Sequence, residues 1–213
     1  MGSEKIYKIL IDKSIRIPTG VVRWRTELAL SINQLKTAFT FAKLCSSSIF
    51  DRVFQYKIVT QILPTQKYLH RYKVEESDLC RRCFECADSV YHNLWQCSRL
   101  TSYLSVCFGF LRSECNLVED INAENYLFGF SESNRVGINH VLLELKKLIF
   151  YSCKDDISVV AFRELFKNKI RSLIIKEKTI AQSNNEYATF CVKWDSFTAF
   201  YDFRGPDLQI LYS

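Results

Sequence analysis

Residues that break helices or form turns are scarce in this chain, whose 213 residues include only 6 glycines and 3 prolines. This scarcity excludes collagen-like and linker-rich proteins and favours helices over a β-sandwich with many turns. No apolar run approaches the roughly 20 residues that a membrane span needs, and no secretory signal follows the polar start. We therefore expect an intracellular protein, cytoplasmic or nuclear, that does not bind a membrane.

Charge of one sign does not dominate the chain either. Lys and Arg number 29 and Asp and Glu 23, which gives a net charge of +6. This mild basic bias permits contact with nucleic acid but does not require it. Hydrophobic residues make up 48% of the chain, enough to bury a core in one domain or in two small ones.

Apolar residues recur at helical spacing along most of the chain, which predicts an all-α fold. The residues Pro18-Thr19-Gly20 are expected to break the chain, and Phe50, Phe54 and Ile58 to form one buried stripe. The expected helices cover about 21–44, 49–63, 98–111, 134–153, 157–182 and 187–197. We divide the chain into an irregular or extended lead-in (1–20), a helical region with a cysteine-rich insert (21–110), a C-terminal helical region that shares the core (111–204) and a tail (205–213).

The cysteines number nine, and an odd number cannot pair completely within one chain. In an intracellular protein, clustered cysteines favour metal binding over disulfides. The other cysteines occur in apolar helical patterns, where packing in the core is the simpler interpretation; they are Cys45, Cys107, Cys115, Cys153 and Cys191.

The insert, residues 80–97, has the spacing of a zinc site. Cys80 and Cys83 are separated by two residues, and His92 and Cys97 follow with the pattern C-x2-C-x8-H-x4-C. A tight turn presents the first pair and a helix presents the second. Four such ligands would hold Zn²⁺ as a closed, structural tetrahedron with no position for a reacting water. Cys86 offers a further ligand, and the alternative is that all these residues are ordinary core cysteines.

Several motifs together resemble the zinc-binding region that follows the reverse transcriptase in LINE-type (non-LTR) retrotransposon proteins. The resemblance covers residues 20–200 and is strongest over 50–97. It rests on Phe54-Gln55-Tyr56-Lys57-Ile58, Ile62-Leu63-Pro64-Thr65, Leu69-His70, the Cys80/Cys83 pair, His92-x-Leu94-Trp95-x-Cys97, Leu127-Phe128-Gly129, Ile138-Asn139 and Lys193-Trp194. Asp88-Ser89 stands where the family often has Glu-Thr, and this departure changes no ligand.

The resemblance implies a module that binds RNA and works with a reverse transcriptase domain. The chain has no Tyr-x-Asp-Asp motif, no recognisable endonuclease set and no glycine-rich phosphate loop, so we expect no catalysis from it. Two basic groups are candidates for contacts with RNA or another single-stranded nucleic acid, weak and salt-dependent. The first comprises Lys57, Lys67, Arg71, Lys73, Arg81 and Arg82, interleaved with aromatic residues, and the second comprises Lys167, Lys169 and Arg171 on one helix.

Two other functions stay open at this point. The first is a zinc-stabilised protein-interaction or structural domain that docks on a polymerase or another partner. The second is an enzyme with an open zinc position and a general base such as Glu85. A closed set of four ligands argues against the enzyme.

Overall fold

The computed structural model describes residues 18–115, 117, 120–152 and 157–200, and in these the fold is all-α, as predicted. Among these residues, pairing of the β type is limited to one isolated bridge between Leu79 and Ala87. The helices are α2 (Thr19–Leu28), α3 (Ile32–Cys45), α4 (Ile49–Val59), α5 (Gln66–Arg71), α6 (Thr101–Cys115), α7 (Ala123–Phe128), α8 (Val136–Tyr151), α9 (Val159–Ser183) and α10 (Tyr187–Trp194). Short helical turns are η1 (His92–Gln96), η2 (Ser98–Leu100), η3 (Ser133–Arg135) and η5 (Asp195–Phe200).

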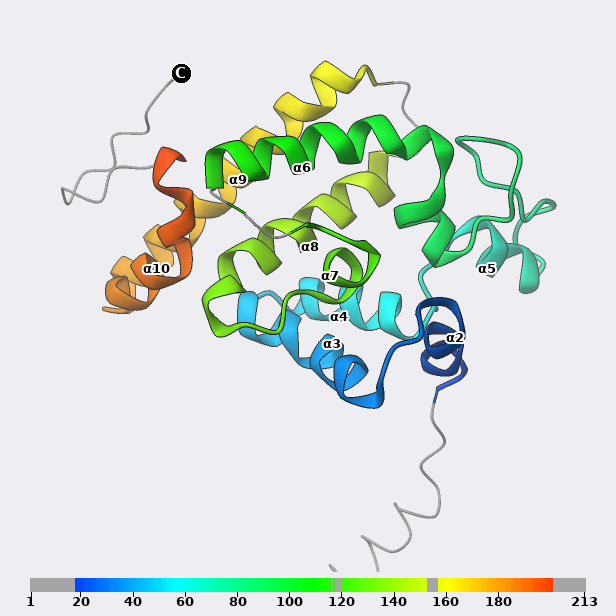
Figure 1. Ribbon diagram of the computed structural model, residues 1–213, viewed down its shortest axis with the longest axis horizontal. Coiled ribbons are helices and arrows are strands. Elements are labelled where there is room, and N and C mark those ends of the chain that lie inside the picture. Colours follow the sequence, from blue (N-terminus) through cyan, green and yellow to red (C-terminus); the bar gives the residue numbers. More distant parts are fainter. Residues whose placement is uncertain (1–17, 116, 118–119, 153–156, 201–213) are drawn as a thin grey trace, which may run out of the picture.

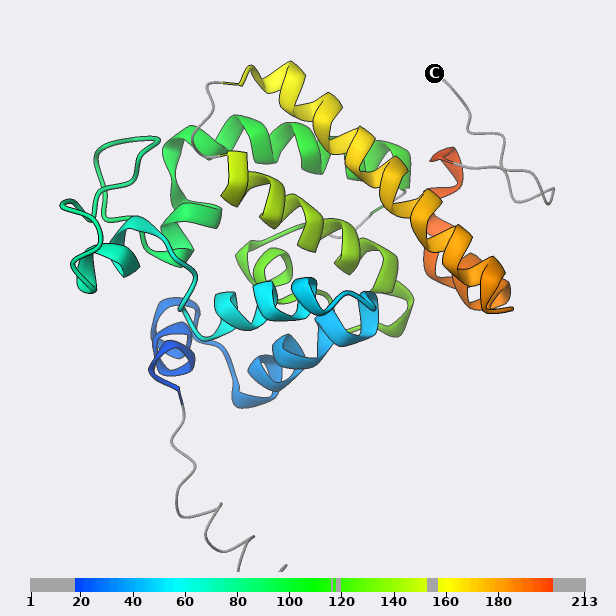
Figure 2. The same cartoon turned by 180° about the vertical axis from the view of Figure 1, so that it is seen from behind.

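Helix α8 lies at the centre of the molecule (Figure 1). It packs against α3, α4 and α7 and against α9, while α6 packs on α9. Eleven of its 16 residues are buried, so the helix is enclosed almost all round, and four of the buried residues are polar or charged: Asn139, His140, Glu144 and Lys146. Helix α5 and the cysteine-rich loop lie at one end of the molecule and α10 at the other, a separation that both views show (Figures 1 and 2).

The helix predicted over 21–44 is two helices, α2 and α3. The chain turns at Ala29, whose φ is 52°, in the left-handed region. Ser31 then caps α3: its hydroxyl accepts the N–H of Gln34, and the Gln34 side chain accepts the N–H of Ser31. A Ser with Gln three residues later is the sequence pattern of a capping box, so the sequence contains a signal for the start of α3. The apolar repeat continues across this point, and the repeat alone therefore does not reveal the boundary.

The helix expected from Val21 begins two residues earlier, at Thr19, so Thr19 and Gly20 belong to α2. Pro18 is the N-cap residue, and its carbonyl accepts the N–H of Val21 at 2.9 Å. Gly20 is buried where α2 approaches the end of α4, and a Cβ there would lie 2.1 Å from the carbonyl oxygen of Thr60. Glycine therefore serves close packing of two helices here and not a turn.

The stripe predicted on α4 is correct for Phe54 and Ile58, which are buried, but wrong for Phe50, which is 80% exposed. The buried residues of α4 follow the series 51, 54, 55, 58 and 59, so the core-facing position of the first turn belongs to Asp51. A residue next to it in sequence is rotated by 100° around the helix, which turns Phe50 towards solvent.

The later helices agree with the predictions: α8 covers most of 134–153 and α9 most of 157–182. Among the cysteines expected in the core, Cys45, Cys107 and Cys115 are buried and Cys191 is half-buried. The predicted lead-in up to residue 17, Cys153, the 154–156 loop and the tail lie outside the described residues. None of the described helices combines the length and the apolar character needed to cross a membrane.

Candidate metal centre

The first two cysteines are held by a tight turn. The N–H of Phe84 donates to the carbonyl of Cys80 at 2.8 Å, and the N–H of Cys80 donates to the carbonyl of Cys86 at 2.8 Å. Phe84 has a φ of 59°, a left-handed conformation that costs a non-glycine residue free energy. The turn places the sulfur atoms of Cys80 and Cys83 on the same side, as the x2 spacing predicts.

The other two candidate ligands occupy the two ends of a helical turn. His92 begins η1, where the N–H of Cys97 donates to its carbonyl at 3.0 Å in the i to i+5 pattern of a π-helix. Ser89 positions the start of this turn, because its hydroxyl accepts the N–H of His92 at 3.0 Å. The wider turn brings both side chains to the face that Cys80 and Cys83 occupy.

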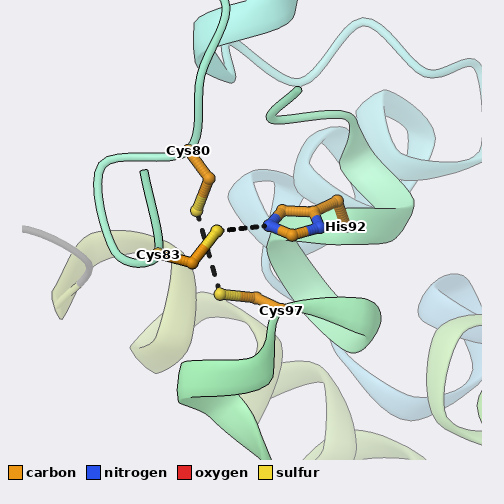
Figure 3. Close-up of side chains that lie close together, drawn as sticks. All are labelled: Cys80, Cys83, His92 and Cys97. Carbon is orange, nitrogen blue, oxygen red and sulfur yellow. Dashed lines mark hydrogen bonds between the residues drawn. The ribbon is translucent and has the colours of Figure 1, made fainter. Parts of the chain in front are cut away.

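All four ligand atoms lie within 4.8 Å of one another (Figure 3). The sulfur atoms of Cys80 and Cys97 are 3.9 Å apart, and the sulfur of Cys83 is 3.4 Å from Nε2 of His92. A tetrahedron with zinc–sulfur bonds of about 2.3 Å and a zinc–nitrogen bond of about 2.05 Å has edges of about 3.8 Å between sulfurs and about 3.6 Å between sulfur and nitrogen. The cluster therefore has the size and the donor atoms to hold a metal ion.

The surroundings favour the metal-binding form of some of these four side chains and oppose it in others. Burial opposes the thiolate of Cys83, but hydrogen bonds from the backbone N–H groups of Glu85 and Cys86 outweigh it and lower the pKa of Cys83. Burial lowers the pKa of His92, which favours the neutral imidazole that binds metals. Burial, with a lesser contribution from the neighbouring Cys80, raises the pKa of Cys97 to about 12. Cys97 therefore needs a cation beside it to ionise.

Cys86, the spare ligand in the sequence, does not belong to this group. Its side chain is exposed, and its sulfur is not among the four atoms that lie together. It contributes to the turn through its backbone carbonyl and its N–H group.

A buried carboxylate ties the cluster to the rest of the fold. Asp88 accepts the backbone N–H of Gln66 at 2.9 Å with one oxygen and the side-chain amide of Asn93 at 2.9 Å with the other. It therefore joins the start of α5 to η1. Asp88 and Ser89, the pair that departs from the family pattern, both position the residues around His92.

The first predicted basic group divides between two cavities. Lys67 and Arg71 line a cavity of about 800 Å³ between α2, α5 and the segment that leads to η1. Arg81 and Arg82 line another, of about 720 Å³, between the cysteine loop and the start of α6. Lys57 and Lys73 line neither cavity.

The second predicted basic group does not form one surface. Lys167 and Arg171 are four residues apart and share a face of α9, whereas Lys169 is rotated by about 200° from Lys167. The ammonium group of Lys167 lies 5.4 Å from the centre of the Phe110 ring on α6. That of Lys169 instead lies 3.4 Å from a carboxylate oxygen of Glu144 on α8.

The sequence analysis missed a second buried polar cluster, in which Asp51, His140 and Glu144 also lie within 4.8 Å of one another. Lys147 bridges the two carboxylates of this cluster, with its ammonium group 2.7 Å from both Asp51 and Glu144. Burial opposes these charges, but the hydrogen bonds lower the pKa of Asp51 and raise that of Lys147. Because an ammonium ion already bridges the two carboxylates, this cluster is a salt-bridge network between α4 and α8.

The network continues to the far end of the molecule. Nδ1 of His140 lies 3.1 Å from Glu177 on α9 and 3.0 Å from the ammonium group of Lys193 on α10. Glu177 also accepts the indole N–H of Trp194 at 2.9 Å. Only Lys193-Trp194 carried a signal, through the family resemblance; the carboxylates are isolated in the sequence and have no diagnostic spacing.

No protein-family model, no curated protein and no solved structure matches this chain.

Proposed function

We propose that this protein is a zinc-stabilised module that binds single-stranded RNA and performs no catalysis of its own, in keeping with its resemblance to the C-terminal region of LINE-type reverse transcriptases. Three thiolates and one imidazole suit zinc, which prefers soft and borderline ligands in a tetrahedron. Four protein ligands leave no position for a reacting water, which supports a structural role. A reverse transcriptase domain would supply the chemistry.

The observation that carries the RNA proposal is the cavity beside α5. It combines the cations Arg23, Lys67 and Arg71 with the rings of Tyr68 and Tyr72, whose centres are 4.9 Å apart. Cations neutralise phosphates, and aromatic rings stack on unpaired bases. Asp88 joins the start of α5 to η1, so the metal cluster and this surface belong to one unit.

Binding of a labelled 20-nucleotide oligo(U), measured by fluorescence anisotropy at several salt concentrations, tests this function. If about four phosphates are neutralised, log K falls with log salt at a slope of about −3. The double variant Lys67→Gln/Arg71→Gln should bind at least about tenfold more weakly and reduce the slope. Lys36→Gln/Lys43→Gln removes the same charge from α3 and is the matched control. Equal losses in both variants, or no salt dependence, would contradict the proposal.

A second function, docking on a protein, is favoured by an apolar area on α3 and α4, here called the α3–α4 surface. It comprises the exposed side chains Phe39, Leu44, Ile49, Phe50, Val53 and Tyr56. The rings of Phe39 and Tyr56 are 6.2 Å apart, so the two helices contribute to one surface. The exposed charges on these helices are basic, which fits a partner with an apolar stripe bordered by acidic residues.

Photo-crosslinking distinguishes the two functions. A photoreactive amino acid is placed at position 50, on the α3–α4 surface, or at position 72, beside α5. RNA joined at position 72 and nothing at position 50 supports RNA binding. Protein joined at position 50 without RNA at position 72 supports docking and opposes RNA binding.

A further inference from the structure

The cavity between the cysteine loop and α6 differs from the others in its charge. Among the described residues that line it are three arginines, Arg81, Arg82 and Arg99, and none that is acidic. Each of three other cavities contains at least one carboxylate, for example Glu27 beside α5 and Asp51 beside α9. Arg81 is already paired with Glu75, whose carboxylate oxygen lies 2.9 Å from its guanidinium group, so Arg82 and Arg99 are the two guanidinium ions that would attract an anion.

Arg82 adds a second observation that points to a ligand. One of its terminal nitrogens donates to the backbone carbonyl of Asn93. Its other two nitrogens, Nε and Nη1, are buried and have no hydrogen-bond partner among the described residues. Buried donors of a charged group are costly to leave unpaired, and an oxyanion that reaches the Arg82 guanidinium would accept a hydrogen bond from it.

The start of α6 faces the same cavity. Ser98 and Ser102, in the first turns of η2 and α6, line it with their neighbour Arg99. A helix N-terminus carries partial positive charge, and serine hydroxyls donate hydrogen bonds to phosphate oxygens. The anion that these groups fit best is therefore a phosphate.

The cavity also has apolar and aromatic walls. Phe84 lines it from the cysteine loop, and 71% of its side chain is exposed. Apolar side chains of α8 and α9 line another side. A bare phosphate ion would use none of these, whereas a base attached to a phosphate would stack on the phenylalanine ring. The volume of about 720 Å³ suits a small organic ligand.

From this combination we propose that the cavity between the cysteine loop and α6 binds a nucleoside phosphate, with Arg82 and Arg99 on the phosphate and Phe84 against the base. The nucleotide comes either from free solution or from a single-stranded nucleic acid; only the second source rests on the function proposed above. The metal cluster holds both sides of the cavity, because Arg81 and Arg82 lie between two of its ligands and Ser98 follows a third.

Isothermal titration calorimetry on the full metal-loaded chain tests the site with AMP, adenosine and inorganic phosphate as probes. We expect AMP to bind at least about tenfold more tightly than either fragment, because it alone engages both the arginines and the ring. The variants Arg99→Gln and Phe84→Ala should each weaken AMP by about tenfold while retaining one metal ion per chain. Arg25→Gln, an exposed change on α2, is the matched control and should bind AMP normally.

The source of the nucleotide is tested with an eight-nucleotide oligo(U). If Arg99→Gln weakens both AMP and the oligonucleotide, the site binds a nucleotide within a strand; if it weakens AMP alone, the site binds free nucleotides. A different result overturns this inference and leaves the RNA function standing. In that result the wild type does not bind AMP, Lys67→Gln/Arg71→Gln loses binding of the oligonucleotide, and Arg99→Gln binds the oligonucleotide normally. Binding of phosphate as tightly as AMP, or unchanged AMP binding in both variants, also overturns it.

Discussion

The carboxylate of Asp88 accepts the backbone N–H of Gln66 across 22 positions of sequence at a distance of 2.9 Å. Its other oxygen accepts the amide of Asn93, the residue after His92. One buried side chain therefore fixes α5, which carries Lys67 and Arg71, relative to the turn that carries two of the candidate metal ligands. Asp88 therefore links the basic cavity beside α5 to the candidate metal cluster.

Replacing Asp88 by alanine should lower the free energy of unfolding by about 2 kcal/mol, because two buried donors lose their acceptor. Urea denaturation of the metal-loaded protein measures this. Asp120→Ala is the control: Asp120 is exposed and pairs with Arg112 on the surface at 2.7 Å, so its loss should cost less than about 1 kcal/mol. Equal effects of the two substitutions would contradict the role given to Asp88.

The metal cluster predicts one zinc ion per chain, measured by plasma mass spectrometry. Cys83→Ser should lose the zinc and part of the helical circular dichroism signal, because the turn and η1 are then no longer joined. Cys86→Ser should keep one zinc ion, since the sulfur of Cys86 lies outside the cluster. A well-folded wild type without zinc, or loss of zinc in Cys86→Ser, would refute the four-ligand set.

Two glycines in helices should respond to alanine in opposite directions. A Cβ on Gly20 would lie 2.1 Å from the carbonyl oxygen of Thr60, so Gly20→Ala should destabilise the fold by about 1–3 kcal/mol through overpacking. A Cβ on Gly109, in α6, meets nothing within 4 Å, so Gly109→Ala should stabilise by about 1 kcal/mol through helix propensity. Thermal unfolding of the two variants checks the signs.

Lys146 on α8 should make stability depend on pH. It is fully buried, its ammonium group donates to the side chain of Gln55 and the carbonyl of Leu127 at 2.9 Å each, and burial lowers its pKa to about 7. In the unfolded chain the amine keeps its proton up to about pH 10.4. Between these values the unfolded state binds more protons, so the free energy of unfolding rises with pH, by up to about 1.4 kcal/mol per pH unit.

Urea denaturation at pH 7, 8 and 9 tests this dependence by comparing wild type with Lys146→Met. The free energy of unfolding of the wild type should increase relative to that of Lys146→Met as the pH rises, because only the wild type has the Lys146 amine, which loses its proton in the folded state. Below about pH 7 both states bind the proton and the difference should level off. The exposed Lys43→Met is the control. Parallel pH profiles for wild type and Lys146→Met would rule out a lowered pKa for Lys146.

Local sequence patterns predicted much of the fold. The 3.6-residue repeat located α8 and α9, because a helix that packs on a core repeats its apolar residues at that period. It did not locate the break between α2 and α3, since the apolar repeat continues across Ala29 and Ser31. The repeat also predicted wrongly that Phe50 is buried. Asp51 occupies the core-facing position instead, where its carboxylate accepts a hydrogen bond from Lys147, 96 positions away in the sequence.

By itself, the sequence determined the all-α class and the identity of the four grouped residues, because helix periodicity and the C-x2-C-x8-H-x4-C spacing are local properties of the chain. Only the tertiary structure decided that Cys86 lies outside this group, that the first basic group divides between two cavities, and that Asp51, His140, Glu177 and Lys193 form one buried network. These relationships join residues far apart in the chain, and side chains at such separations meet only when helices pack.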